Sequence, residues 1–547
     1  GIAPDNAYQL VVDTVRSAER TLELEVYKLE HRELVDELVQ RAQEGVTVTV
    51  LLEGAPAGGM PVQTLWACQQ LHATGRGLCA AMVHSDTLRI DDRYTFLHSK
   101  MMIVDRARVL VGSQNFSATD LPGDDKANGT GGSRGVVIVT DAPSVVACAV
   151  EIFEADCDPA AHADISIWSN DNVHRFGLPP SGFVPQGGDD WTGYTVQFPT
   201  PISATGTWLE LLTAPESALR TRDALLGLLA RAGAGSAIHA EQLYEYADWG
   251  DPLTAPNPRL QAYLAAARRG ARVRILLNGG TFATPGFPLT GNLTTAATVN
   301  TIARAEGLDL EVRLADPTRY GVHNKMILVD LGAGGQYAHM GSLNGSEASS
   351  KVNREVALQV RSAEVYNYLR AMFDYDWAHQ PEWHVVISEL LYRPADQING
   401  YREWIEIYNP TSEDVSLSGW YLGDMTAPVG GLTTALNEGM YRFPPGATLP
   451  AGGVIVVAQQ AADIVGFTPD YEFVTDRNRD LPAVPNMQRV DPGASSGSDG
   501  LRLVDTGDEV VLRDAGGVLV DGVAYGAGVL TGVTAHPGGV NAGHSLE

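Results

Sequence analysis

Two stretches of ten residues decide the fold: FLHSKMMIVD at residues 96–105 and GVHNKMILVD at residues 321–330. Each stretch places a histidine and a lysine two positions apart at the start of an apolar run that ends in aspartate. His98 and His323 are 225 positions apart in the sequence. The preceding apolar runs repeat with the same offset, since GVTVTVLLEG at residues 45–54 corresponds to GARVRILLNG at residues 270–279. The chain is therefore expected to contain two copies of one structural unit.

Strand-like and helix-like segments alternate within each copy. Helix-like segments at residues 30–44 and 258–269 precede the apolar runs, and strand-like segments at residues 22–27 and 238–244 precede the helices. This order predicts βαβ units, a largely parallel sheet in each copy, and helices packed on the outside of the sheets.

The composition of the chain changes after about residue 380. Short apolar runs then alternate with Gly, Pro and Asp turns, which is typical of an all-β sandwich or barrel. We expect an α/β protein with two pseudo-symmetric α-β-α halves, followed by an all-β immunoglobulin-like sandwich. The expected order is a first half at residues 1–158, a connector at 159–207, a second half at 208–380, the sandwich at 384–530 and a tail at 531–547.

The bulk composition narrows the classes of function. The 547 residues carry a formal net charge of −28, and no Lys/Arg-rich block stands out, which disfavours non-specific binding to nucleic acid. No apolar run approaches the roughly 20 residues that a membrane helix needs. The four cysteines fall into two close pairs in the first third of the chain, and two local disulfides or four free thiols both fit this pattern.

The spacing of histidine and lysine suits phosphodiester chemistry. Residues i and i+2 of a strand point to one face, so His98 projects with Lys100, and His323 projects with Lys325. Two halves can thus bring two imidazoles and two ammonium groups to one cavity. The lysines would neutralise the non-bridging oxygens, one imidazole would attack phosphorus, and the other would protonate the leaving oxygen. Neither a metal ion nor another cofactor is expected, because the lysines supply the positive charge.

This double motif resembles the signature of the phospholipase D superfamily over about residues 6–380. After each aspartate of the motif comes Gly-Ser-x-Asn, at residues 112–115 and 341–344, with four extra residues before the second copy. The resemblance implies a covalent phosphohistidine, with His98 as nucleophile and His323 as general acid. It further implies that the lysines bind phosphate. The two motif aspartates, Asp105 and Asp330, are assigned to the catalytic set. Four further candidates would bind phosphate or support the site: Asn115, Asn344, Ser113 and Ser342.

The two copies differ at the acidic residue that typically orients a histidine in this family. Residues 353–356 read NREV and place Glu355 at that position, whereas residues 133–136 read SRGV and place Gly135 there. One histidine is therefore expected to lack an orienting carboxylate, unless Asp124 or Asp125 substitutes for it.

The last part of the chain, about residues 384–530, resembles a lamin-tail domain, which is an immunoglobulin-like sandwich. The resemblance is carried by ISELLYRP, EWIEIYNP, LSGW, LPAGG and GDEVVL, at residues 387–394, 403–410, 417–420, 449–453 and 507–512. Such domains accompany secreted bacterial hydrolases and have accessory roles, with no partner indicated by the sequence.

The resulting hypothesis is a secreted or extracytoplasmic phospholipase D. It would hydrolyse glycerophospholipids at a membrane or micelle surface and transfer the phosphatidyl group to alcohols. The alternative is a nuclease, or another phosphodiesterase of the same superfamily, that uses the same site.

Overall fold

The computed structural model describes most of the chain, namely residues 1–83, 92–169, 177–188, 193–250, 255–279, 289–379, 384–395, 401–411, 414–423, 439–473, 480–490, 503–530, 533, 535–536 and 541–546. The chain forms two compact units, Gly1–Pro381 and Glu382–Glu547. Among the described residues, no helix has the length and apolarity needed to cross a membrane.

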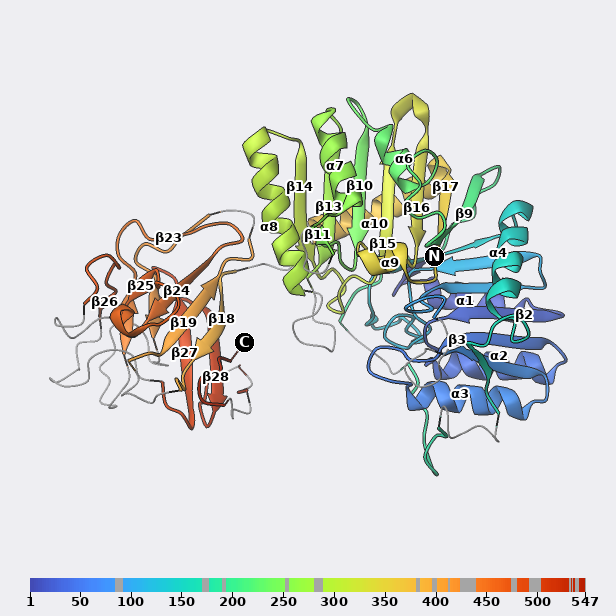
Figure 1. Ribbon diagram of the computed structural model, residues 1–547, viewed down its shortest axis with the longest axis horizontal. Coiled ribbons are helices and arrows are strands. Elements are labelled where there is room, and N and C mark those ends of the chain that lie inside the picture. Colours follow the sequence, from blue (N-terminus) through green and yellow to red (C-terminus); the bar gives the residue numbers. More distant parts are fainter. Residues whose placement is uncertain are drawn as a thin grey trace. The chain divides into compact units, whose positions relative to one another are not determined.

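The first half of the larger unit is an eight-stranded sheet in the order β1-β7-β6-β5-β2-β3-β4-β8 (Figure 1). Its strands are β1 (Ile2–Ala3), β2 (Thr21–Val26), β3 (Thr47–Glu53), β4 (Gly77–Met82), β5 (Lys100–Val104), β6 (Arg108–Gly112), β7 (Gly135–Thr140) and β8 (Ile165–Ile167). Its helices are α1 (Ala7–Arg16), α2 (Arg32–Gln43), α3 (Val62–Ala73) and α4 (Pro143–Asp156).

The second half is a seven-stranded sheet in the order β14-β13-β10-β15-β16-β17-β9. Its strands are β9 (Trp208–Ala214), β10 (Ala237–Gln242), β13 (Arg272–Asn278), β14 (Leu310–Ala315), β15 (Lys325–Asp330), β16 (Gln336–Gly341) and β17 (Glu355–Arg361), and the short strands β11 (Asp248–Trp249) and β12 (Ala255–Pro256) pair with each other. Its helices are α6 (Leu225–Ala230), α7 (Pro258–Arg268), α8 (Leu289–Glu306), α9 (Glu347–Lys351) and α10 (Ala363–Ala378).

The expectation of a largely parallel sheet is wrong. Only β2, β3 and β4 pair in parallel in the first half, and only β10, β13 and β14 do so in the second, among the described strands. The strands that follow each histidine form antiparallel hairpins, β5–β6 and β15–β16, because the connections between them are too short for a crossover helix. The sheets are therefore mixed, while the expected α/β class and the repeat are confirmed.

The two halves share one hydrophobic core. Met101 and Ile103 of β5 point into this shared core, whereas the alternate residues Met102 and Val104 point into a second core beneath α1, α2 and α3. The shared core also contains side chains of β15, β16, β17, α4 and α10. Burying each such apolar side chain contributes roughly 1.5–3 kcal/mol, so the seam between the halves is a major source of stability.

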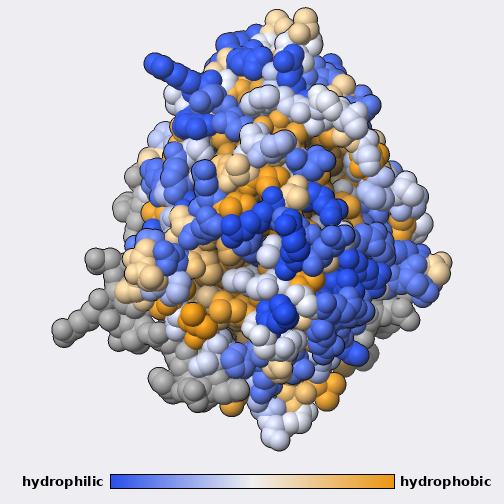
Figure 2. All heavy atoms as spheres, turned by 90° about the vertical axis from the view of Figure 1, so that its right-hand side faces the viewer, coloured by the Kyte–Doolittle hydropathy of each residue, from blue (hydrophilic) through white to orange (hydrophobic). Residues whose placement is uncertain are grey.

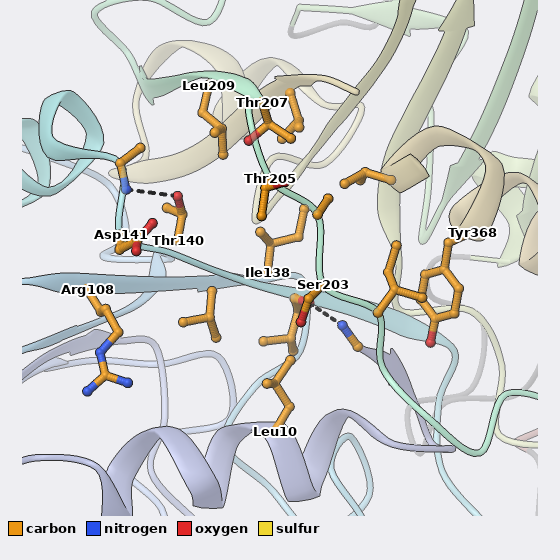
Figure 3. Close-up of a pocket in the computed structure, with 18 of the residues that line it drawn as sticks. Leu10, Arg108, Ile138, Thr140, Asp141, Ser203, Thr205, Thr207, Leu209 and Tyr368 are labelled. Carbon is orange, nitrogen blue, oxygen red and sulfur yellow. Dashed lines mark hydrogen bonds between the residues drawn. The ribbon is translucent and has the colours of Figure 1, made fainter. Parts of the chain in front are cut away.

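A cavity of about 650 Å³ opens at this seam (Figure 3). It is lined by Thr140 and Asp141 at the end of β7, by Ser203 and Thr205 of the connector, and by Tyr368 of α10. None of the histidines or lysines of the two motifs lines it.

The connector between the halves contains the strand β8 and otherwise irregular described segments. Tyr194 from this connector is 5% exposed and packs against Arg134 at the seam. All four cysteines carry free thiols. Burial, together with a hydrogen bond to Cys79, raises the pKa of Cys68 well above its ordinary value.

The smaller unit is an all-β sandwich, as expected. Its strands are β18 (Val386–Leu391), β19 (Trp404–Tyr408), β20 (Val415–Ser416), β21 (Tyr421–Gly423), β22 (Met440–Arg442), β23 (Thr448–Leu449), β24 (Val454–Ala458), β25 (Tyr471–Glu472), β26 (Gln488–Arg489), β27 (Gly507–Arg513) and β28 (Leu519–Gly526). They form sheets in the orders β18-β19-β24-β25 and β26-β22-β21-β27-β28, with β20 paired to β23. Ile405 and Ile407 of β19 meet Val510 and Leu512 of β27 in one core, which gives the period-2 burial of a sandwich.

Candidate active site at the seam of the two halves

The two motifs lie at the starts of β5 and β15. Lys100 and Lys325 are the first residues of these strands, and each histidine comes two residues earlier. The backbone N–H of His98 donates to the carbonyl oxygen of Arg354 at 2.9 Å, and that of His323 donates to the carbonyl oxygen of Arg134 at 2.9 Å. Each histidine is thus held by backbone from the opposite half, so both motifs meet at the seam.

The ring of His98 is oriented by Glu355, as the sequence predicts, and the contact crosses the seam. Nδ1 of His98 lies 2.8 Å from Oε2 of Glu355. The other carboxylate oxygen accepts hydrogen bonds from Ser349 Oγ at 2.5 Å and Asn353 Nδ2 at 3.3 Å. Although burial opposes ionisation, the charge and hydrogen bond of His98, together with the charge of Lys100, lower the pKa of Glu355 below its ordinary value. An ionised carboxylate therefore fixes the His98 ring through Nδ1 and leaves Nε2 to face a substrate.

The ring of His323 is oriented by an amide instead, from a residue that the sequence analysis missed. Nδ1 of His323 lies 3.2 Å from Oε1 of Gln114. The Gln114 amide is held in this orientation because its Nε2 donates to the carbonyl oxygens of Asp120 at 2.8 Å and Ser133 at 2.9 Å. Oε1 therefore accepts from Nδ1–H, which makes Nε2 of His323 the nitrogen that exchanges a proton with a substrate.

Gly135 makes room for this amide. A Cβ added at Gly135 would lie 2.2 Å from Oε1 of Gln114, so a glutamate at this position would displace the Gln114 amide from its contact with His323. A carboxylate remains nearby, because Oδ2 of Asp120 is 4.0 Å from Nδ1 of His323. Gln114 thus takes the orienting role of the missing glutamate, and the carboxylate of Asp120 lies near the same ring nitrogen.

The expected substitutes, Asp124 and Asp125, do not take this role. Asp124 binds Lys126 and accepts from Thr130 Oγ1 at 3.0 Å, and Asp125 accepts from the backbone N–H of Ala127 at 2.8 Å. A signal for Gln114 was present in the sequence. The repeat pairs GSQN with GSLN, so a glutamine replaces Leu343 in the same half in which a glycine replaces Glu355.

The two lysines are buried in equivalent environments. Nζ of Lys100 donates to the carbonyl oxygen of His98 at 2.7 Å, and Nζ of Lys325 donates to that of His323 at 2.6 Å. Burial lowers the pKa of Lys100 to about 8, against the opposing effect of Glu355. Burial, reinforced by the charge of Lys100, lowers the pKa of Lys325 well below its ordinary value. An anion bound between the two ammonium groups would relieve this repulsion.

The two imidazoles have different electrostatic environments. Burial lowers the pKa of both rings, and the lysines lower it further. The charge of Glu355 offsets part of this effect at His98, whereas the pKa of His323 lies well below its ordinary value. His98 is therefore the more basic ring, and the protonated form of His323 is the stronger acid.

The serines and asparagines of the two Gly-Ser-x-Asn segments surround the histidines. Ser113 Oγ and Ser342 Oγ each accept a backbone N–H at 3.0 Å, from Val136 and Val356, and so fix the strands that follow. Nδ2 of Asn115 is 3.4 Å from Nε2 of His323, which brings Asn115 to the reacting side of that ring.

Asn344 is held through its backbone. Its carbonyl oxygen accepts from Arg259 Nη1 at 2.9 Å, and its backbone N–H donates to Ser349 Oγ at 2.9 Å. The side-chain oxygens of Asn115 and Asn344 are buried and have no hydrogen-bond partner within the described part of the chain, so both amides can serve a substrate.

The motif aspartates lie outside the site, which corrects their assignment as catalytic residues. Asp105 follows the far end of β5, roughly 16 Å from Lys100 by the rise of a strand. Its carboxylate accepts the backbone N–H groups of Glu19, Arg20 and Thr21 at 2.7–2.9 Å. Asp330, at the far end of β15, accepts the N–H of Gly332 at 2.7 Å. Both carboxylates therefore bind backbone N–H groups of turns. They lie away from the site because the site is formed at the opposite ends of the two strands.

Comparisons with known protein families agree with this site. Residues 11–156 and 252–377 match the family described as cardiolipin synthase, PLD-like domain, and these segments contain both motifs. Residues 379–527 match the family described as lamin tail domain. A comparison with curated proteins finds no match.

Solved structures with related folds are remote in sequence. Phosphatidylserine synthase from Haemophilus influenzae is 15% identical, with 69% of this chain and 85% of that chain covered and a TM-score of 0.47. Nuc, a phospholipase D family member from Salmonella typhimurium, is 20% identical, with 31% and 96% covered and a TM-score of 0.25. Polyphosphate kinase from Porphyromonas gingivalis is 12% identical, with 68% and 49% covered and a TM-score of 0.39.

The family match and the paired site agree on one assignment. A duplicated histidine-lysine motif, joined across a seam by Glu355 and Gln114, lies in the segments that match the PLD-like family. The chain belongs to the phospholipase D superfamily of phosphodiesterases and carries a C-terminal lamin tail domain.

Proposed function

We propose that the protein is a phospholipase D that cleaves the distal phosphodiester bond of glycerophospholipids through a phosphohistidine on His98. The observation that carries this proposal is the paired site itself, with two imidazoles and two buried lysines at one seam. The lysines would bind the non-bridging oxygens, where their charge also stabilises the pentacoordinate transition state.

His98 is the better nucleophile of the two rings. Glu355 accepts from Nδ1–H, raises the basicity of Nε2, and stabilises the positive ring that forms when Nε2 bonds to phosphorus. At Nδ1, His323 has the neutral Gln114 amide at 3.2 Å and the Asp120 carboxylate at 4.0 Å, and its pKa is strongly lowered. Once protonated beside the bound phosphate, it gives its proton readily to the leaving oxygen. In the second step it would take a proton from the attacking water or alcohol.

A substrate with a single phosphodiester suits the charges around the site. Three buried arginines near the motifs are bound to buried carboxylates: Arg134 to Asp376, Arg354 to Asp156, and Arg259 to Glu245. They are therefore not available to the flanking phosphates of a nucleic acid. The net charge of −28 repels polyanions and anionic bilayers alike, so a zwitterionic headgroup such as phosphocholine is favoured. On the face drawn in Figure 2, hydrophobic residues form patches within a mostly hydrophilic surface.

A nuclease is the second candidate, because aromatic rings beside the site offer a surface on which nucleobases can stack. The ring of Tyr27 lies 5.0 Å from that of His98 between centroids, and Tyr244 stacks on Tyr246 at 4.9 Å. Such rings can stack on nucleobases as readily as they contact lipid.

The test offers phosphatidylcholine vesicles with ethanol, and single-stranded DNA, each with a chelator present. The lipid proposal expects choline release and phosphatidylethanol, with DNA left intact. Cleavage of DNA without lipid turnover would instead establish the nuclease. His98→Ala abolishes either activity under this proposal, and turnover by that variant would refute the mechanism.

We further propose that the protein acts outside the cytoplasm, where its lamin tail domain has an accessory role toward a partner that awaits identification. Fractionation of the source cells tests this placement, since retention of the full-length protein in the cytosol would contradict it.

A further inference from the structure

We propose that Arg134 and Arg354 are positioning residues that hold the nucleophile and the general acid through two crossed, buried ion pairs. Each arginine belongs to one half and binds an aspartate and a histidine-bearing segment of the other half. This inference rests on the proposed function for its kinetic consequences, while its geometric basis is independent of the substrate.

Arg354 links the second half to His98 of the first. Its side chain is 6% exposed, and its Nε and Nη2 lie 2.6 Å and 3.1 Å from the two carboxylate oxygens of Asp156, the last residue of α4. Its backbone N–H donates to the carbonyl oxygen of Phe96 at 2.9 Å, and its carbonyl oxygen accepts from the N–H of His98 at 2.9 Å. The next residue is Glu355, which orients the His98 ring.

Arg134 makes the mirror arrangement toward His323. Its side chain is fully buried, and its Nε and Nη2 donate to the two oxygens of Asp376 in α10 at 2.8 Å and 2.9 Å. Its backbone N–H donates to the carbonyl oxygen of Gly321 at 2.9 Å, and its carbonyl oxygen accepts from the N–H of His323 at 2.9 Å. We call each arginine–aspartate pair, together with the backbone contacts of its arginine, an arginine lock. Arg134 and Arg354 are 220 positions apart, and so are Asp156 and Asp376, so the two locks are equivalent parts of the repeat.

The charge of each of the two aspartates acts on a buried glutamate. Glu25 accepts from Ser99 Oγ at 2.6 Å, and burial together with the charge of Asp156 raises its pKa to about 8. In the other half, burial and the charge of Asp376 raise the pKa of Glu241 well above its ordinary value. At neutral pH Glu25 is therefore largely protonated, and the charge of Asp156 is left to Arg354.

These contacts give each arginine a role that a lysine would not fill. Arg134 forms a bidentate pair with Asp376 through two hydrogen bonds, whereas Arg354 hydrogen-bonds Asp156 through Nη2 and forms an ion pair with it through Nε. Two contacts from one planar guanidinium fix an angle as well as a distance, which a lysine cannot do. The two locks therefore set where each ring stands relative to a phosphate between them, and a displacement of about 1 Å costs on the order of 10²-fold in rate.

The two locks predict different defects. Arg354→Lys displaces His98 and slows attack on phosphorus, whatever the leaving group. Arg134→Lys displaces His323, which slows the departure of a leaving group that must be protonated and also the later attack of water on the phosphohistidine. Each defect should appear at about 10²-fold in the rate at which the leaving group is released in the first turnover, with KM changed by less than about threefold, because the lysines still bind phosphate.

The experiment compares two substrates in the full-length chain: phosphatidylcholine, whose alkoxide leaving group needs a proton, and bis(p-nitrophenyl) phosphate, whose nitrophenolate does not. In the first turnover, Arg354→Lys should slow the release of both leaving groups, whereas Arg134→Lys should slow the release of choline and leave that of nitrophenolate unchanged. Asp156→Asn and Asp376→Asn should reproduce the same two patterns. The matched control is Arg268→Lys, which changes an exposed pair with Glu306 and should leave both rates unchanged.

A second measurement requires no turnover. In protein labelled at histidine, Arg134→Lys should shift the ring resonances of His323 and leave those of His98 in place, and Arg354→Lys should do the reverse. Equal slowing of both first-turnover releases by Arg134→Lys, or ring shifts that do not follow the crossed pattern, would overturn the inference. Wild-type protein that turns over neither substrate would overturn the proposed function instead, while the resonances would still decide the positioning.

Discussion

At the scale of single residues, the site is asymmetric because of one compensating pair. Gly135 removes a side chain that would collide with Gln114, and Gln114 occupies the place of an orienting glutamate. His323 consequently has a neutral partner, while His98 has the carboxylate of Glu355. Two copies of the same motif thereby acquire different acid–base properties from their neighbours alone.

Gln114→Leu tests this pair, because leucine is the residue of the other copy at this position. The variant removes the acceptor at Nδ1 of His323, and we expect kcat for phosphatidylcholine to fall by roughly 10²-fold, the lower end of what a general acid contributes. Gln40→Leu is the control, since Gln40 is an exposed helix residue paired with Glu44. An unchanged kcat in the Gln114 variant would show that the amide does not orient the ring.

The lowered pKa of Lys100 predicts a pH dependence. Phosphate binding needs the protonated lysine, so the contribution of Lys100 to kcat/KM should be lost as pH rises through its pKa of about 8. On the acid side, the lowered pKa of His98 keeps its ring neutral to below its usual range, so the acid limb should lie below about pH 6.5.

Lys100→Arg provides the check on the alkaline limb, because arginine stays protonated. We expect lower activity but no decline near pH 8. If the kcat/KM of this variant still fell near pH 8, the decline would be due to another ionisable group.

At the scale of elements, the sequence patterns predicted the repeat, the strands that bear the motifs and the sandwich, because each of these depends on local periodicity. The antiparallel hairpins were missed because strand direction depends on the length of a connection that has no periodicity of its own. Gln114 and the arginine locks were missed for a different reason. Their partners are about 200 residues away, and only the packing of one half against the other makes them neighbours.

The shared core should make β17 important for stability. Leu358 is fully buried in that core. Leu358→Ala should lower the free energy of unfolding by roughly 2–5 kcal/mol, because the cavity left behind is enclosed by both sheets. Ile167→Ala, at a residue that is 41% exposed, should change it by less than about 0.5 kcal/mol. Urea unfolding followed by tryptophan fluorescence compares the two, and equal effects would argue against a shared core.

At the scale of the whole molecule, every described residue of the site lies in the unit Gly1–Pro381. A chain of residues 1–381 should therefore hydrolyse bis(p-nitrophenyl) phosphate with kcat within about threefold of the full-length value, because the reacting groups and their supports are retained. A loss of tenfold or more in a fragment with unchanged circular dichroism would mean that the lamin tail domain contributes to the site.

The central claim is that two copies of one motif form a single site with divided roles, in which His98 carries the phosphoryl group. Acid-free quenching during turnover, followed by peptide mass spectrometry, tests it most directly. With bis(p-nitrophenyl) phosphate, whose leaving group needs no proton, the account predicts a phosphoryl adduct on His98, more of it in a His323→Asn variant that cannot complete the second step, and none in His98→Asn. An adduct on His323, or rapid turnover by His98→Asn, would contradict the account.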